Sequence, residues 1–152
     1  MKKRNIILIG MPGAGKSSVG VILAKVLGYE FIDTDLVIQH REKRLLREII
    51  ADEGNEGFLA IENEVNATLE ADKSVIAPGG SAIYGKEAME HFKEIGTIVY
   101  LKLSYEDLAK RLGNLKGRGV VLKEGQTLKD LYDERSKLYE QYAEITVDES
   151  GR

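Results

Sequence analysis

Several residue types are scarce or missing in this chain of 152 residues. It has no cysteine, which excludes disulfide bridges and metal sites built on thiolates. No apolar run approaches the roughly 18 residues that a membrane-spanning helix needs. A net charge of −3 provides no broad basic surface for nucleic acid. We therefore expect neither a membrane nor a nucleic acid as a partner.

The composition that remains is typical of one globular domain, which we expect to span residues 1–152. Hydrophobic residues make up 43% of the chain, enough for a sizeable core without covalent cross-links. Lys2-Lys3-Arg4 resembles the basic start of a signal peptide, but the apolar segment behind it, residues 6–9, is too short. We therefore expect a cytoplasmic protein, and a monomer.

Residues 10–17 carry the strongest motif, G-x-x-x-x-G-K-S, which is the phosphate-binding P-loop. A strand-like segment precedes it and a helical pattern follows, as the motif requires. The glycines let backbone N–H groups approach phosphate oxygens, and the helix N-terminus adds positive charge. The alternative is a glycine-rich turn with a solvated lysine. We expect nucleotide contacts from Gly13, Ala14, Gly15, Lys16, Ser17 and Ser18, with the Ser17 hydroxyl as a ligand of Mg²⁺.

Strand-like and helical segments alternate along the chain, which predicts a parallel sheet with helices on both faces. Strands are expected at residues 5–9, 29–32, 74–77, 97–103 and 145–147. Helices are expected near residues 16–27, 36–43, 45–52, 57–71, 86–93, 105–112 and 128–143. Ligands of such sheets bind beyond the carboxyl ends of the strands.

Asp33 and Asp35 follow the second expected strand, at the edge where the P-loop lies. Residues i and i+2 of an extended chain share a face, so both carboxylates can point into one site. One could then organise Mg²⁺ while the other activates a substrate hydroxyl. The alternative is that either residue only caps the next helix.

Two further features indicate ligand contacts. Gly79 and Gly80 follow the third strand and let a ligand approach the backbone closely, unless they form only a turn. Arg135 falls within the apolar stripe of the last helix, where a guanidinium needs an anionic partner or a wet cavity. A phosphate or a substrate carboxylate would serve. A side chain that reaches back to solvent and a structural ion pair are the alternatives.

Residues 113–126 lack apolar periodicity and are rich in glycine and basic residues, which favours a lid loop over a plain surface connection. Arg118 within this loop could bring positive charge to a transferring phosphoryl group. Arg111 lies at the end of the preceding helix, where it could simply stabilise the helix C-terminus.

Together these motifs resemble the shikimate kinase family over nearly the whole chain and in the same order. The counterparts are the P-loop, Asp33-Thr34-Asp35, Phe58-x-x-x-Glu62, Gly79-Gly80, the lid arginine and Arg135-x-x-x-Tyr139. The resemblance implies a P-loop three-layer sandwich, with a five-stranded parallel sheet in the order 2-3-1-4-5. It also implies Mg²⁺-dependent transfer of the ATP γ-phosphate to the 3-hydroxyl of shikimate.

The same resemblance implies roles for single residues. Lys16 and Arg118 would stabilise phosphoryl charge, Ser17 would bind Mg²⁺, and Asp33 would hold the ion through water. Asp35 would orient or deprotonate the hydroxyl. Gly79, Gly80 and Arg135 would hold the substrate, and Arg111 would lie against adenine.

Leu59 departs from the family pattern, which has an arginine directly after the phenylalanine to bind the substrate carboxylate. A leucine cannot make that contact, and losing it costs on the order of 2–4 kcal/mol of binding. Ser81 also replaces a third glycine. We expect a kinase acting on shikimate. The alternatives are a kinase of another polyol, sugar acid or hydroxylated amino acid, and a nucleotide-binding regulatory protein without turnover.

Overall fold

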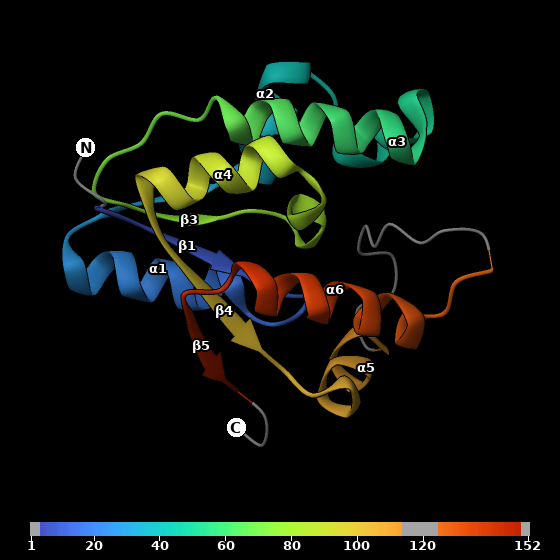
Figure 1. The fold of residues 1–152 in the computed structure, drawn as a ribbon. Helices are drawn as coiled ribbons and strands as arrows, with labels where there is room; N and C mark the ends of the chain where they lie inside the picture. The colour runs from blue at the N-terminus through green and yellow to red at the C-terminus, as the bar shows by residue number, and fades with distance from the viewer. Residues whose placement is uncertain (1–3, 114–124, 150–152) are drawn as a thin grey trace.

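The computed structural model describes residues 4–113 and 125–149. Its strands form one sheet in the order β2-β3-β1-β4-β5, and each neighbouring pair runs parallel (Figure 1). The bounds are β1 Asn5–Ile9, β2 Glu30–Asp33, β3 Ser74–Ala77, β4 Gly96–Lys102 and β5 Ile145–Asp148. The order and direction expected from the sequence are therefore confirmed.

The helices also follow the expected order. They are α1 Lys16–Leu27, α2 Thr34–Glu42, α3 Leu46–Ala67, α4 Lys86–Ile95, α5 Tyr105–Gly113 and α6 Leu128–Tyr142. The two helices expected at 45–52 and 57–71 are the arms of α3, which bends at Gly54 (φ 75°, ψ 175°). The short 3₁₀ helix η1, Gly80–Tyr84, was not predicted, because five residues are too few to display an apolar period.

One layer of the core lies on each face of the sheet, because successive strand residues point to opposite faces, and a third cluster lies between α2 and α3. Ile7 and Ile98 pack on one face with Phe92 of α4 and with residues of α6. Leu8 packs on the other face with residues of α1. Figure 1 shows α1 on one side of the sheet, and α4 with α3 beyond it on the other. This is the expected three-layer sandwich.

Helix α1 approaches the sheet through its smallest residues, Gly20 and Ala24, which are buried. Ile22 and Val26 belong to the apolar period of this helix, yet they are 65% and 77% exposed. A Cβ atom on Gly20 would lie 2.5 Å from the ring of Phe31, so only glycine permits this approach. The apolar period therefore predicted the helix but only part of its buried face, since Val19 and Leu23 do pack against the core.

Parallel strands bring their carboxyl ends to one edge of the sheet. The P-loop follows β1, the Asp33–Asp35 turn follows β2, and Gly79 and Gly80 follow β3. Three segments far apart in sequence thus meet beside α3 and α6. Within the described ranges, no helix has the length and apolar character that crossing a bilayer requires.

Candidate active site

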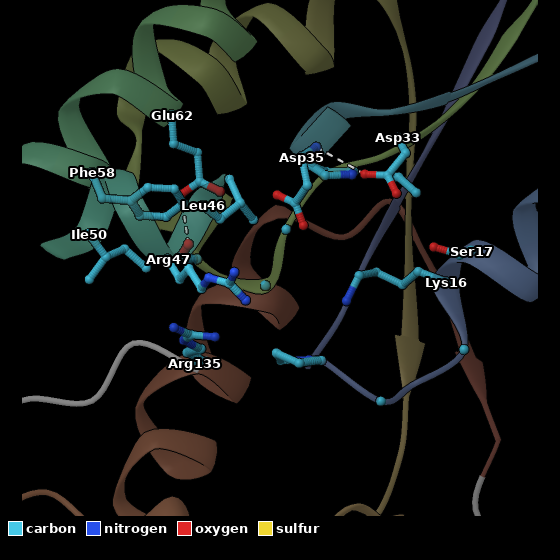
Figure 2. A pocket seen from close by; sticks show the side chains of 18 of the residues that line it. Lys16, Ser17, Asp33, Asp35, Leu46, Arg47, Ile50, Phe58, Glu62 and Arg135 are labelled. Carbon is cyan, nitrogen blue, oxygen red and sulfur yellow. Dashed lines mark hydrogen bonds between the residues drawn. The ribbon is translucent and has the colours of Figure 1, made fainter. Parts of the chain in front are cut away.

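A cavity of about 600 Å³ lies at the carboxyl edge of the sheet (Figure 2). The P-loop and the start of α1 form one side, and residues of α3 and α6 form the other. Ten residues expected from the sequence line it: Gly13, Gly15, Lys16, Ser17, Ser18, Asp33, Asp35, Gly79, Gly80 and Arg135. The fold therefore brings most of the expected site into one space.

Two expected site residues are placed differently. Ala14 is buried, and its backbone N–H donates to the Met11 carbonyl over 3.1 Å. Arg111 lies against the P-loop, donating from Nη1 to the carbonyl of Gly13 over 3.0 Å. Neither lines the cavity. Arg118, with most of the expected lid, lies outside the described residues. Nucleotide contacts from these three stay predictions.

The P-loop has the backbone shape that its glycines allow. Gly13 (φ 91°) and Gly15 (φ 84°) both adopt positive φ values, and Gly15 caps the N-terminus of α1. The positive end of the α1 dipole is therefore directed at the cavity. Lys16 donates from Nζ to the carbonyls of Gly10 (2.7 Å) and Met11 (3.0 Å). The loop and its lysine form a compact cradle for an anion.

Asp33 ends β2, whereas Asp35 already lies in the first turn of α2. The expectation that both share one face of an extended strand is therefore wrong for Asp35, since the helix begins at Thr34. The carboxylate of Asp33 accepts a hydrogen bond from the Asp35 backbone N–H over 2.9 Å and caps α2. Both carboxylates nevertheless line the cavity, so Asp33 is at once a helix cap and a site residue.

The environment of Asp35 makes it a stronger base than an exposed aspartate. Burial, together with repulsion from Asp33, raises the pKa of Asp35 to about 6 against the opposing positive charge of Lys16. A carboxylate with this pKa is mostly ionised at pH 7 and can accept a proton from a hydroxyl. Figure 2 shows Asp35 between the P-loop and the α3–α6 side of the cavity.

Glu62 is a buried cavity residue to which the sequence analysis assigned no role. It is 1% exposed, and its Oε1 accepts a hydrogen bond from Ser81 Oγ over 2.7 Å. Burial raises the pKa of Glu62 to about 7; the Ser81 hydrogen bond opposes this shift, and the charge of Asp35 adds to it. Ser81, which departs from the family pattern, therefore has a partner in the site. The only sequence signal for Glu62 was the Phe58-x-x-x-Glu62 segment.

Gly79 and Gly80 belong to the cavity wall, although η1 also begins at Gly80. A Cβ atom on Gly79 would lie 3.0 Å from oxygens of both Asp35 and Glu62. A Cβ atom on Gly80 would lie 2.7 Å from Pro12 Cδ and 2.9 Å from Arg135 Nη1. Side chains at these positions would disturb the functional groups around them.

Arg135 is 1% exposed, so its side chain does not reach back to solvent. Its guanidinium lies over the ring of Tyr84, 5.5 Å from the centroid. Within the described parts of the chain, Nε and Nη2 have no hydrogen-bond partner and no carboxylate forms an ion pair with them. A buried guanidinium with open donors favours an anionic ligand.

Arg47 is a cavity residue that the sequence analysis missed entirely. It lies at the start of α3 and lines the cavity across from Lys16 (Figure 2). The apolar pattern identified Arg47 only as part of a helix and carried no signal for a site. Leu59 does not line the cavity; it packs against the cluster that contains Ile49 and Phe58.

A P-loop, a neighbouring carboxylate with a raised pKa and a buried guanidinium with open donors are together typical of a small-molecule kinase of the P-loop class. The family model described as shikimate kinase matches residues 12–152. The chain belongs to the shikimate kinase family.

Individual relatives agree with this assignment. Shikimate kinase 2 of Yersinia enterocolitica is 34% identical over 154 residues, covering 95% of this chain and 86% of that protein. The structure of shikimate kinase from Acinetobacter baumannii in complex with shikimate has a TM-score of 0.83 at 36% identity, covering 95% of this chain and 82% of that one. Shikimate kinase from Aquifex aeolicus gives a TM-score of 0.75 at 32% identity, covering 95% and 85%.

Proposed function

We propose that this protein transfers the γ-phosphate of ATP to the 3-hydroxyl of shikimate, giving ADP and shikimate 3-phosphate. The observation that carries the proposal is the position of Asp35 in one cavity with the P-loop and with the buried, open guanidinium of Arg135. Membership of the family and the likeness to a relative whose structure contains shikimate support the choice of acceptor.

The donor half of the site is the P-loop with the start of α1. Backbone N–H groups around Gly13 and Gly15 and the ammonium of Lys16 would hold the phosphates. The Ser17 hydroxyl and the Asp33 carboxylate fit Mg²⁺, which prefers oxygen ligands and keeps several of its own waters. When bound, the ion supplies charge neutralisation between the β- and γ-phosphates.

In the acceptor half, Asp35 takes the proton of the substrate hydroxyl while the hydroxyl oxygen forms a bond to the γ-phosphorus. The bond from that phosphorus to the bridging oxygen breaks, and ADP leaves with the electron pair. Lys16 stabilises the charge on the phosphoryl oxygens, and Arg118 would add to this from the lid. Arg135 would bind the shikimate carboxylate, which fixes the ring with one hydroxyl near Asp35.

A coupled ADP-release assay over a panel of acceptors tests this function. The panel contains shikimate, quinate, gluconate and homoserine, each with ATP and Mg²⁺, and the matched control is Asp35→Asn. We expect ADP release with shikimate in the native protein and its loss in Asp35→Asn. No ADP release with shikimate would contradict the acceptor assignment, while binding of ATP without turnover of any acceptor would favour a regulatory protein.

A kinase of another polyol, sugar acid or hydroxylated amino acid remains the second candidate, because Leu59 removes the arginine that the family places there. Turnover of such a compound in the same panel, at higher kcat/KM than shikimate, would favour it. The single-domain organisation of residues 1–152, the monomeric state and the cytoplasmic location stay predictions.

A further inference from the structure

The wall of the cavity includes a charged side chain, Arg47, that the family pattern does not explain. We propose that Arg47 is a second carboxylate-binding arginine, which acts together with Arg135 in the acceptor half of the site. It would supply the guanidinium that the family pattern places at position 59. This inference rests on the proposed function, and it deepens it by assigning recognition of the carboxylate to a different element, the start of α3.

The position of Arg47 supports this role. Arg47 and Arg135 come from α3 and α6, and both line the same cavity. In Figure 2 they lie on one side of it, with Lys16 and Ser17 on the other. Asp35 lies between the two sides. An acceptor with a hydroxyl beside Asp35 and a carboxylate away from the P-loop would reach both arginines.

The contacts of Arg47 also support a role in ligand binding. Among the described residues, no partner forms a hydrogen bond or an ion pair with the Arg47 side chain. Arg44, three residues earlier, is paired with three carboxylates at 2.9–3.2 Å: Glu42, Asp52 and Glu53. These three acidic side chains are therefore paired with Arg44 rather than with Arg47. The guanidinium of Arg47 retains its full set of donors for a ligand.

Helix stability does not account for Arg47. It is the second residue of α3, where the helix dipole is positive and a cation is unfavourable. Arg47 is exposed at the cavity wall, whereas Arg135 is buried in the same cavity. An anion bound beside Arg47 would offset the unfavourable charge at this end of the helix. The nearby acids Asp35 and Glu62 favour a singly charged carboxylate over a phosphate dianion, because they repel the second charge.

The test compares Arg47→Gln and Arg47→Lys with native protein in the ADP-release assay, with Arg44→Gln as the matched control. We expect Arg47→Gln to raise KM for shikimate roughly 10- to 100-fold, the loss typical of a charge-assisted hydrogen-bonding pair. KM for ATP and kcat should stay close to native values. Arg47→Lys should be intermediate, since lysine keeps the charge but not the bidentate geometry. Arg44→Gln should keep the native KM for shikimate.

Methyl shikimate has no negative charge. It therefore separates a loss of carboxylate binding from a general disturbance of the acceptor site by the substitution. Native protein and Arg47→Gln should show the same KM for this ester. Equal losses with shikimate and its ester, or an unchanged KM for shikimate in Arg47→Gln, would overturn the role of Arg47 while leaving the proposed function intact. If native protein neither phosphorylates shikimate nor binds it in calorimetry, the proposed function fails, and the carboxylate role of Arg47 fails with it.

Discussion

The carboxylate of Asp33 caps helix α2 by accepting a hydrogen bond from the backbone N–H of Asp35 over 2.9 Å. This single contact fixes the start of the helix and the spacing of the two acids that face the cavity. Asp33 therefore has two roles, as the cap of helix α2 and as a charged carboxylate in the cavity, and substitutions can separate them.

Asp33→Asn should remove the charge but keep the cap, because asparagine is as good an N-cap as aspartate. We expect near-native thermal stability together with a weakened response to Mg²⁺ and lower activity. Asp33→Ala should lose the cap as well, at a cost of about 0.5–2 kcal/mol in the free energy of unfolding. Thermal melts and Mg²⁺ titrations of activity measure the two effects. Equal stability losses in both variants would contradict a capping role for the side chain.

The pH dependence of activity should follow the ionisation of Asp35. Burial, with repulsion from Asp33, raises the pKa of Asp35 to about 6, so the rate should fall as the pH drops through that value. The rate profile with shikimate and a carboxyl NMR titration of the ligand-free protein measure this. Asp33→Asn should lower the Asp35 pKa by removing the repulsion. An acid limb near pH 4 in the native protein would argue against Asp35 as the base.

The free energy of unfolding should fall as the pH rises, whereas the rate should fall as the pH drops. Because the folded-state pKa values of Asp35 and Glu62 are raised to about 6 and about 7, the folded protein binds more protons than the unfolded chain over this range. The stability that these two carboxyls contribute is present below about pH 4 and is lost as the pH rises through 6 and 7. In Glu62→Gln, the upper part of this dependence should disappear from denaturant-unfolding curves recorded between pH 5 and 8.

Local motifs in the sequence were sufficient to place Gly13, Gly15, Lys16 and Ser17 at the cavity, although Ala14 and Arg111 do not line it. The P-loop positions Lys16 and Ser17 through its own backbone and the helix that follows, so its structure depends little on distant residues. The sheet order followed from the family resemblance. Asp35 was placed in the correct region for a partly wrong reason, since it lies in a helix rather than on a strand.

The acceptor half could not be predicted in the same way. Arg47, Glu62 and Arg135 meet only because α3 bends at Gly54 and packs near η1 and α6. Arg135 was detectable because a charged residue interrupted an apolar stripe. Arg47 and Glu48 occupy the polar positions between the apolar residues Leu46 and Ile49, so Arg47 interrupts no apolar stripe and its place in the cavity depends on tertiary structure alone.

The hydrogen bond from Ser81 to Glu62 should contribute measurable stability. Ser81→Ala removes the only donor that the described residues provide to Glu62 Oε1, which leaves a buried oxygen without a partner. We expect a loss of about 1–3 kcal/mol in the free energy of unfolding and a further rise in the pKa of Glu62. Combining Ser81→Ala with Glu62→Met, which has no side-chain oxygen to accept the hydrogen bond, in a double-mutant cycle isolates the pair. A coupling energy of zero would show that the contact contributes nothing.

Gly80→Ala should damage acceptor binding more than nucleotide binding. The added Cβ would lie 2.7 Å from Pro12 Cδ and 2.9 Å from Arg135 Nη1, so the guanidinium must move from its position over Tyr84. We expect KM for shikimate to rise roughly tenfold or more, in line with the displacement of one charged contact, while KM for ATP changes little.

Tyr139→Phe is the matched control for that substitution. Tyr139 donates from its hydroxyl to the Gly80 carbonyl over 2.6 Å, so the variant loosens the same backbone without adding an atom to the cavity. It should lower the free energy of unfolding by about 1 kcal/mol and leave KM for shikimate less affected than Gly80→Ala does. If both variants raise KM equally, the position of the Gly80 backbone, rather than the displacement of Arg135, governs acceptor binding.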